Sequence, residues 1–173
     1  IEDVTVVTGY KSEKISELGY KTIYNQDWQK ANMVSSLLKA FAETSTDVIV
    51  SYSDIVFNKE ALESLKEQSN DIAITYDPNW LNLWRNRSDS PEADSETFDI
   101  NEDNFLIEIG GRPSDLSKVK GQFMGLLKFS QKGKGIVNDF IKKNPEARIN
   151  FDTTKLLAQL IKQGELIKVV KYT

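Results

Sequence analysis

Short apolar runs rich in β-branched residues alternate, along the first half of the chain, with segments whose apolar residues recur at helical spacing. The runs predict buried strands at residues 4–7, 47–52 and 71–76 and a brief strand at 21–24, with 47–52 as the best candidate for the centre of a sheet. Such alternation is typical of an open, mostly parallel sheet covered by helices. The sequence therefore predicts an α/β fold.

The helices expected between these strands begin at recognisable polar residues. Asn32 and Asn58 are good N-caps for two of them, and a shorter helix is expected at residues 11–18, ending before Gly19. The second half of the chain has a polar segment, a hairpin, and then a strand, two helices and a final strand. Its predicted strands lie at residues 97–100, 105–109, 122–129 and 166–172, and its predicted helices at 132–142 and 153–163.

We expect residues 1–173 to form a single domain, because the sequence contains neither an internal repeat nor a linker. A length of 173 residues is enough for one full hydrophobic core. The chain begins and ends within apparent strands, and we therefore expect that sequence is missing on both sides.

The composition excludes several kinds of chemistry. The chain has no Cys and no His, which removes disulfides, thiolate catalysis, imidazole bases and His-based metal sites. A metal ion would be bound by oxygen, so Mg²⁺, Mn²⁺ or Ca²⁺ is expected. A net charge of −4 disfavours non-specific electrostatic binding to nucleic acid or to an anionic membrane. Without a long apolar run or a signal peptide at its start, the protein is expected to be intracellular and cytoplasmic.

Asp54 is the first candidate functional residue. It follows the predicted strand at residues 47–52, and ligands of open α/β sheets gather at the carboxyl ends of strands. A carboxylate there can hold Mg²⁺ against a triphosphate. The alternative is that Asp54 only begins a turn before the next helix.

The polar segment at residues 76–96 is the second candidate. It carries Trp80, Trp84 and Arg87 and then several acids that end at Glu96. A long irregular loop in a compact domain is usually functional or disordered, and two tryptophans argue against disorder. The aromatic rings could enclose a cationic head group. Alternatively, both indoles simply pack the loop onto the core.

Two weaker candidates are a glycine-flanked strand and a helix start. Gln122 could hydrogen-bond a sugar or a base edge, and Gly125 could let a ligand approach the backbone, although a β-bulge explains these glycines equally well. Asn32 and Ser36 lie at the start of a helix whose free N–H groups favour an anion, although capping alone explains Asn32. Neither a phosphate-loop signature nor a G-x-G-x-x-G run is present.

Several runs together resemble the nucleotidyltransferase family, in the branch of sugar-phosphate and phosphocholine or phosphonate cytidylyltransferases. They follow the family's order over most of residues 4–170, and the third and sixth of them are the most specific. The runs are VTVVTGYKSEKI, YNQDWQKANMVSSLLKA, VIVSYSDIVF, WLNLWRNRSDSPEADSETF, LIEIGGRP and GQFMGLLKFS.

The resemblance implies a Rossmann-like nucleotidyltransferase fold with a mixed, mostly parallel sheet and helices on both faces. It implies Mg²⁺-dependent transfer of a nucleotidyl group, with CTP favoured, to a small phosphorylated acceptor such as phosphocholine or a sugar phosphate. Asp54 would be the metal-binding and catalytic residue, and Asn32 and Ser36 would lie near the nucleotide. The acceptor side would be bordered by Trp80, Trp84, Arg87, Glu96, Gln122 and Gly125. Asp152 matches a recurring acid of the family.

The sequence departs from the family pattern in two places. Family members open with a glycine-rich loop that grips the triphosphate, and a second metal-binding aspartate usually follows the last strand present here. We therefore expect this chain alone to be inactive. A non-catalytic member of the fold that binds a nucleotide or a partner is the alternative, and a glycosyltransferase is disfavoured because Asp54 stands without a second acid. A homodimer is left open.

Overall fold

The computed structural model describes residues 3–87 and 89–172, without the side chain of Glu92. Each predicted strand and helix is present, with ends within two residues of the expected ones. The strands are β1 (Thr5–Thr8), β2 (Lys21–Tyr24), β3 (Val48–Ser51), β4 (Ile72–Asp77), β5 (Phe98–Ile100), β6 (Leu106–Ile109), β7 (Gln122–Phe129) and β8 (Ile167–Lys171). The helices are α1 (Ser12–Ser16), α2 (Met33–Ala42), α3 (Lys59–Lys66), α4 (Trp80–Arg87), α5 (Pro91–Asp94), α6 (Gln131–Lys143), α7 (Ala147–Asn150) and α8 (Thr153–Lys162), with a 3₁₀ turn η1 at Leu116–Lys118.

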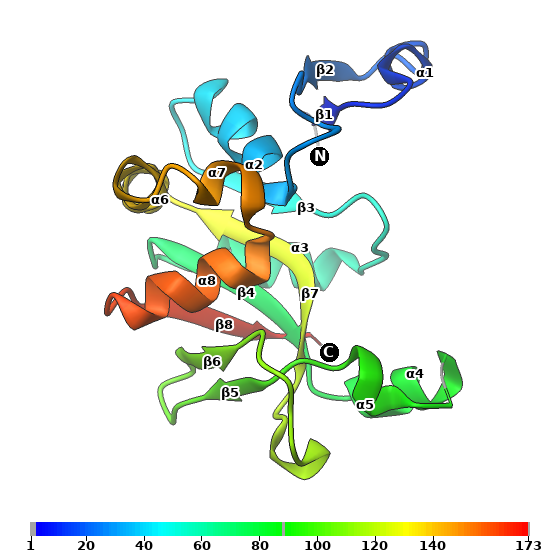
Figure 1. Cartoon of the computed structure of the whole chain (residues 1–173), viewed down its shortest axis with the longest axis vertical. Helices are drawn as coiled ribbons and strands as arrows, with labels where there is room; N and C mark the ends of the chain where they lie inside the picture. Colours follow the sequence, from blue (N-terminus) through cyan, green and yellow to red (C-terminus); the bar gives the residue numbers. More distant parts are fainter. Residues whose placement is uncertain (1–2, 88, 173) are drawn as a thin grey trace.

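The main sheet has the strand order β3-β7-β4-β8 (Figure 1). β4 and β8 are parallel, whereas β7 is antiparallel to both of its neighbours, so β3, β4 and β8 share one direction. β1 and β2 pair in parallel as a separate sheet, and β5 and β6 form an antiparallel hairpin. The mixed α/β fold that the sequence predicts is therefore confirmed, with three of the four strands of the main sheet running in one direction.

The prediction that residues 47–52 form a central strand is wrong for the described part of the chain. β3 lies at the edge of the four-stranded sheet and pairs only with β7. β7 comes about seventy residues later along the chain, and it inserts between β3 and β4. A local apolar pattern indicates that a strand is buried. It does not indicate which distant strand lies beside it.

Helices cover both faces of the main sheet, because neighbouring residues of each strand point to opposite sides. Ile72 and Ile74 of β4 pack in a large core with α2, α6 and α8, whereas Ala73 between them packs in a smaller core with α3. Figure 1 shows α3 behind the sheet and the other three helices in front of it. The apolar stripe of each helix follows its helical period, as in α8, where Leu156 and Leu160 are fully buried.

The segment after β4 is helical and not irregular, which corrects the expectation of a loop. Trp80 begins α4 and is 2% exposed, and its indole N–H donates to the carbonyl of Val119. The Asp77 carboxylate accepts from the N–H of Asn79 just before the helix. Pro91 begins α5 at a position where its missing N–H costs nothing. The W-x₃-W spacing, which places both indoles on one helix face, is the local sequence signal for this helix.

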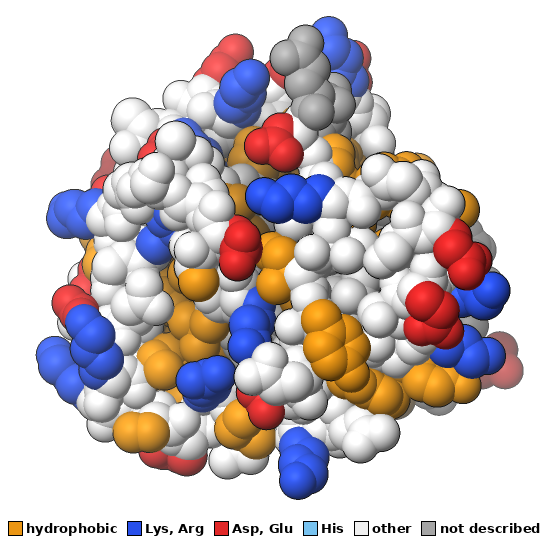
Figure 2. All heavy atoms as spheres, turned by 90° about the horizontal axis from the view of Figure 1, so that it is seen from above, with side chains coloured by type: hydrophobic (Ala, Val, Ile, Leu, Met, Phe, Trp, Pro, Cys, Tyr) orange, Lys and Arg blue, Asp and Glu red, His pale blue; other side chains and the backbone are white. Residues whose placement is uncertain are grey.

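Figure 2 views the molecule from the end that carries β1, β2 and α1. Hydrophobic side chains gather in a hollow of this face, with charged side chains of both signs around it. Among the residues that the structure describes, no helix is both long and apolar enough to cross a membrane.

Candidate active site at the end of β3

Asp54 lies where the sequence places it, in the turn that follows the carboxyl end of β3, and it is exposed. The chain leaves the strand at Ser51 but stays attached to the sheet for one more residue, because the N–H of Tyr52 donates to the carbonyl of Gly125 at 2.9 Å. Asp54 therefore projects from a fixed strand end. Its role in metal binding stays a prediction.

Tyr52 lies directly on the backbone of β7. Gly125 has a φ of +83°, and a Cβ atom added to it would lie 2.7 Å from Cγ of the Tyr52 ring. The pairing of β4 with β7 shifts register between Ile74 and Tyr76, opposite this glycine. The irregular register at Gly125 agrees with the interpretation as a β-bulge, and a tyrosine of this chain approaches its backbone closely. A role of Gly125 in ligand binding stays a prediction.

The amino end of α8 meets Tyr52 from the other side. Asp152 caps this helix, and its carboxylate accepts from the N–H of Lys155 at 2.7 Å. Thr153 is hydrogen-bonded through its side chain to Tyr52. Burial raises the pKa of the Tyr52 phenol, and the charges of Asp152, Glu96 and Asp54 raise it further. The three carboxylates are thus near enough to the phenol for their charges to act on its pKa.

Glu96 is fixed in this group through its backbone. The side-chain amide of Gln122, which is 6% exposed, accepts from the N–H of Glu96 and donates to its carbonyl. Desolvation raises the pKa of the Glu96 carboxyl, as does the charge of Asp152, while the Arg112 charge and a hydrogen bond with Thr154 lower it. Gln122 thus positions Glu96, and its amide is already bound within the protein.

The start of α2 joins the same neighbourhood. Asn32 caps α2 through its side chain, which accepts from the N–H of Met33 at 2.8 Å, and its own N–H donates to the carbonyl of Ile149 just before α8. The hydroxyl of Ser36 accepts from the amide of Asn25, which is buried at the end of β2. Two helix amino ends therefore meet beside Tyr52, and Asn32 is exposed at this junction.

The candidate site offers oxygen ligands to a metal ion but no preformed cage. Within residues 3–87 and 89–172, no group of three or more acidic side chains is close enough to hold a metal. Mg²⁺ commonly binds through one or two carboxylates together with waters and phosphate oxygens. An exposed Asp54 at a strand end fits that mode, in which the nucleotide supplies the remaining oxygens.

Among the described contacts, none joins helix α4, which carries Trp80 and Trp84, to Asp54. Trp80 is in the hydrophobic core, so the interpretation of this indole as core packing is correct and it presents no surface to an acceptor. Trp84 is half-buried with its ring 6.0 Å from that of Trp80, and the Arg87 guanidinium lies 5.7 Å from the Trp84 ring. Among the described contacts, none joins Trp84 or Arg87 to Tyr52 or Glu96, and their role in acceptor binding stays a prediction.

Sequence reasoning did not single out Tyr52, Thr153 or Arg112 as site residues, and it left the role of Asp152 open. Two signals were present. Tyr52 stands two residues before Asp54, and Asp152 is followed by Thr-Thr at the start of an apolar helical pattern, which is typical of a helix N-terminus. Arg112 has no such local signal, because it meets the site only through the fold.

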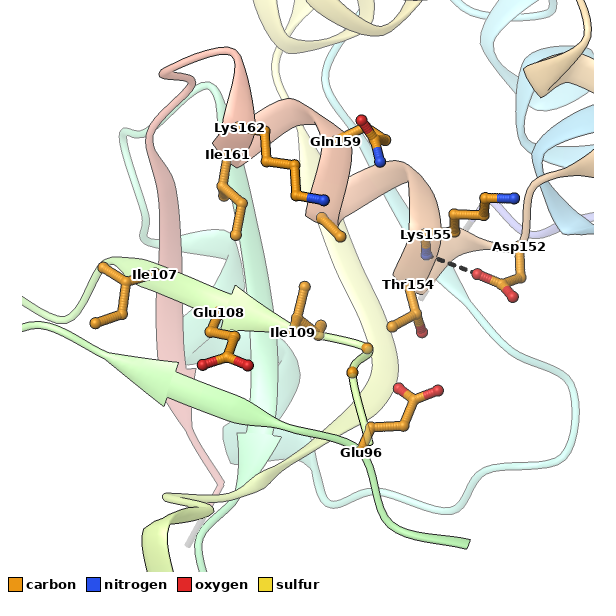
Figure 3. Close-up of a pocket in the computed structure, with 13 residues that line it drawn as sticks. Glu96, Ile107, Glu108, Ile109, Asp152, Thr154, Lys155, Gln159, Ile161 and Lys162 are labelled. Carbon is orange, nitrogen blue, oxygen red and sulfur yellow. Dashed lines mark hydrogen bonds between the residues drawn. The ribbon is translucent and has the colours of Figure 1, made fainter. Parts of the chain in front are cut away.

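A cavity of about 630 Å³ opens from this site between β6 and α8 (Figure 3). Glu96, Asp152 and Thr154 lie at its end nearest Tyr52. Ile107 and Lys162 lie at its other end. The candidate site thus extends from an exposed strand-end carboxylate into a space large enough for a small molecule.

The fold is that of nucleotidyltransferases. The solved structure of the inositol-1-phosphate CTP transferase from T. maritima superposes with a TM-score of 0.73 at 19% identity, over 99% of this chain and 66% of that one. A putative glucose-1-phosphate thymidylyltransferase from Bacillus anthracis, solved with sucrose, superposes with a TM-score of 0.70 at 19% identity, over 100% of this chain and 69% of that one.

In sequence, the chain is 30% identical over 142 residues to the CTP:phosphoglutamine cytidylyltransferase of Campylobacter jejuni. The match covers 75% of this chain and 55% of that protein, so the chain spans about half the length of this relative. The resemblance to the nucleotidyltransferase family, in its cytidylyltransferase branch, is thereby confirmed. No family model matches the chain.

Proposed function

We propose that the protein transfers a cytidylyl group from CTP to a small phosphorylated acceptor and releases pyrophosphate. The observation that carries this proposal is the exposed Asp54 at the carboxyl end of β3, in a nucleotidyltransferase fold, beside the amino ends of α2 and α8. CTP is favoured because both the relative from Campylobacter jejuni and the structural neighbour from T. maritima are CTP enzymes by name.

In the proposed reaction, a phosphate oxygen of the acceptor attacks the α-phosphorus of CTP. The bond from that phosphorus to the bridging oxygen breaks, and pyrophosphate carries away the electron pair. Asp54 would hold Mg²⁺, which when bound neutralises phosphate charge. Asn32 and Ser36 would lie on the nucleotide side through their side chains. The first three N–H groups of α2 are already bonded within the protein, to the side chain of Asn32, the carbonyl of Phe151 and the carbonyl of Asn32.

The acceptor would lie between the strand end and β7. Gln122 would act by fixing Glu96 at the border of this space, and Gly125 by letting Tyr52 rest against the sheet. Trp84 and Arg87 are proposed to border a more remote part of the acceptor, with Trp80 as the core anchor of their helix.

The proposed activity is that of the whole protein, because this chain spans 55% of the relative from Campylobacter jejuni. We propose a single nucleotidyltransferase domain in the cytoplasm, where nucleoside triphosphates are made. We also propose that small molecules, and not nucleic acid or membrane, are its partners, since the net charge of −4 gives the wrong sign of field for polyanions. A mass measurement in solution decides between a monomer and a homodimer.

Pyrophosphate release tests the proposed function. The protein is incubated with Mg²⁺, each of the four common NTPs in turn, and phosphocholine, inositol 1-phosphate, glucose 1-phosphate or phosphoglutamine. The expected result for the whole protein is release that requires both CTP and one of these acceptors, whereas this chain alone is expected to release none. Tight Mg²⁺-dependent CTP binding with no release in any combination would instead favour a non-catalytic nucleotide-binding member of the fold.

A further inference from the structure

Thr153 lies where three elements of the candidate site meet. It is the first residue of α8, and it is 3% exposed. Its hydroxyl is hydrogen-bonded to the side chain of Tyr52, which stands two residues before Asp54. The same hydroxyl oxygen lies 3.9 Å from Sδ of Met33, the first residue of α2. A single buried hydroxyl therefore contacts both the end of β3 and the start of α2.

The contact on the strand side is a rigid one. The N–H of Tyr52 donates to the carbonyl of Gly125 at 2.9 Å, and the Tyr52 ring rests on the backbone of that glycine. The ring of Phe123 lies 5.9 Å from the Tyr52 ring, with the two planes almost perpendicular. Because its backbone and its ring are both held by β7, Tyr52 has little freedom to move relative to the sheet.

The contact on the helix side is reinforced by the backbone. The N–H of Asn32 donates to the carbonyl of Ile149 at 2.8 Å, and the N–H of Val34 donates to the carbonyl of Phe151 at 3.3 Å. Met33 lies between the two donors, so the start of α2 is attached to the segment that leads into α8. A displacement of Thr153 would therefore be transmitted to α2.

The two ends of this connection have different roles in the proposed reaction. Asp54 would hold Mg²⁺, whereas Asn32 and Ser36 would hold the nucleotide at the start of α2. The metal would lie between Asp54 and the phosphates of CTP, so its contribution to binding depends on the distance between the strand end and α2. Small errors in such a distance weaken coordination, because the ligands must be held close to the productive geometry.

We infer that Thr153 is a positioning residue that holds Asp54 and the start of α2 at a fixed separation, so that Mg²⁺ and CTP bind cooperatively. The hydroxyl acts through Tyr52 and Met33 and touches neither ligand. This inference rests on the proposed function, because it takes Asp54 to hold the metal and α2 to hold the nucleotide. Removal of the hydroxyl should weaken the cooperativity and leave the binding of CTP alone intact.

The Mg²⁺ enhancement of CTP binding measures this cooperativity. We define it as the Kd of CTP with the metal chelated divided by its Kd with Mg²⁺. By calorimetry on the whole protein, Thr153→Val should lower the enhancement by about threefold to tenfold, which corresponds to one lost hydrogen bond. The Kd with the metal chelated should change by less than about twofold. Thr153→Ser, which keeps the hydroxyl, should keep the enhancement.

Tyr52→Phe tests the same connection from its other end. It removes the phenol hydroxyl and keeps the ring that packs on Gly125, so the fold should be retained. The enhancement should fall as it does in Thr153→Val. The double variant Tyr52→Phe/Thr153→Val should lower it no further than either single change, because both remove the same bond. If Thr153→Val does not fold, the enhancement in Tyr52→Phe decides.

Thr75→Val is the matched control. Thr75 is a fully buried threonine of β4 whose hydroxyl donates to the carbonyl of Leu126 at 3.3 Å, and none of its described contacts involves Tyr52 or Met33. This variant should keep the enhancement. Equal weakening of CTP binding by Thr153→Val with and without Mg²⁺ would indicate a merely structural role and overturn the inference. An unchanged enhancement in Thr153→Val, an equal loss in Thr153→Ser or an additive double variant would also overturn it.

Turnover separates this inference from the proposed function. If the variants lower the enhancement as predicted but the whole protein releases no pyrophosphate with any acceptor, the positioning role stands and the transferase proposal fails. If release requires CTP and an acceptor but the variants keep the enhancement, the transferase proposal stands and the positioning role fails. A wild-type protein in which Mg²⁺ does not strengthen CTP binding would overturn the positioning role together with the assignment of Asp54.

Discussion

The side-chain amide of Gln122 is hydrogen-bonded to both backbone polar groups of Glu96. Its oxygen accepts from the Glu96 N–H at 3.2 Å, and its nitrogen donates to the Glu96 carbonyl at 2.6 Å. The Gln122 side chain thus makes the two backbone hydrogen bonds that a neighbouring strand would otherwise make. These bonds hold the chain between α5 and β5. The position of the Glu96 carboxylate beside Asp152 follows from this link.

Gln122→Leu should destabilise the protein by about 1 to 3 kcal/mol, because it leaves the N–H and carbonyl of Glu96 without their partners. The free energy of unfolding in urea measures this change. Gln163→Leu, at an exposed position after α8, should change it by no more than about 0.5 kcal/mol. Equal stability of Gln122→Leu and the wild type would show that the amide does not hold Glu96.

Gly125→Ala should be more destabilising than Gly164→Ala, although both glycines have a positive φ. The added methyl at position 125 would lie 2.7 Å from the Tyr52 ring, whereas at position 164 it would meet no atom within 4 Å. Strain in the backbone costs about 1 to 2 kcal/mol at either position, and only Gly125→Ala adds the steric clash. Urea unfolding of the two variants measures the difference.

A background of Tyr52→Ala identifies the source of that difference. Removing the ring should lower the cost of Gly125→Ala toward that of Gly164→Ala, because the ring atoms at 2.7 Å and 2.8 Å from the added methyl are gone and only the Cβ atom at 3.1 Å remains. An unchanged cost in the Tyr52→Ala background would contradict close packing of Tyr52 on β7.

Glu96→Gln should stabilise the protein increasingly as the pH rises. Burial and the charge of Asp152 raise the pKa of the Glu96 carboxyl, so the folded state holds this proton to a higher pH than the unfolded state does. The stability from the protonated form is complete below the unfolded pKa and is lost as the pH rises through the folded pKa. A glutamine remains uncharged and avoids this loss.

Unfolding free energies of Glu96→Gln and the wild type, measured from pH 4 to pH 7, check this. The difference in favour of Glu96→Gln should grow across this range. Glu102→Gln, which removes one negative charge from an exposed turn, controls for net charge. A difference that shrinks with rising pH would mean that the Glu96 carboxylate is stabilised in the folded protein.

Local patterns predict the elements of this fold well but not their arrangement. The caps at Asn32 and Asn58 and the bounds of β7 are readable from a few adjacent residues. The insertion of β7 between β3 and β4 is not, because sheet order is set by contacts between residues far apart in the chain. The helix at Trp80–Arg87 differs from the predicted loop, because its burial of Trp80 depends on contacts with residues far along the chain.

The same distinction holds for the candidate site: positions set by neighbouring residues can be predicted from the sequence, and contacts between distant residues cannot. Asp54 could be located from the sequence because its position depends only on the end of the preceding strand. Gln122 could be recognised as an unusual strand residue, yet its link to Glu96 depends on a partner 26 positions away. Trp80 was readable as an aromatic residue of interest, but its burial is decided by contacts such as that with Val119.

Mg²⁺-dependent binding of CTP by Asp54→Asn tests the central claim most directly. With Mg²⁺ present, the variant should bind CTP about tenfold or more weakly than the wild type, whereas with the metal chelated the two should bind alike. The variant should keep its unfolding free energy, because Asp54 is exposed, and Asp103→Asn in the β5–β6 turn should bind as the wild type does. The same Mg²⁺-dependent affinity in Asp54→Asn and the wild type would contradict the assignment of Asp54.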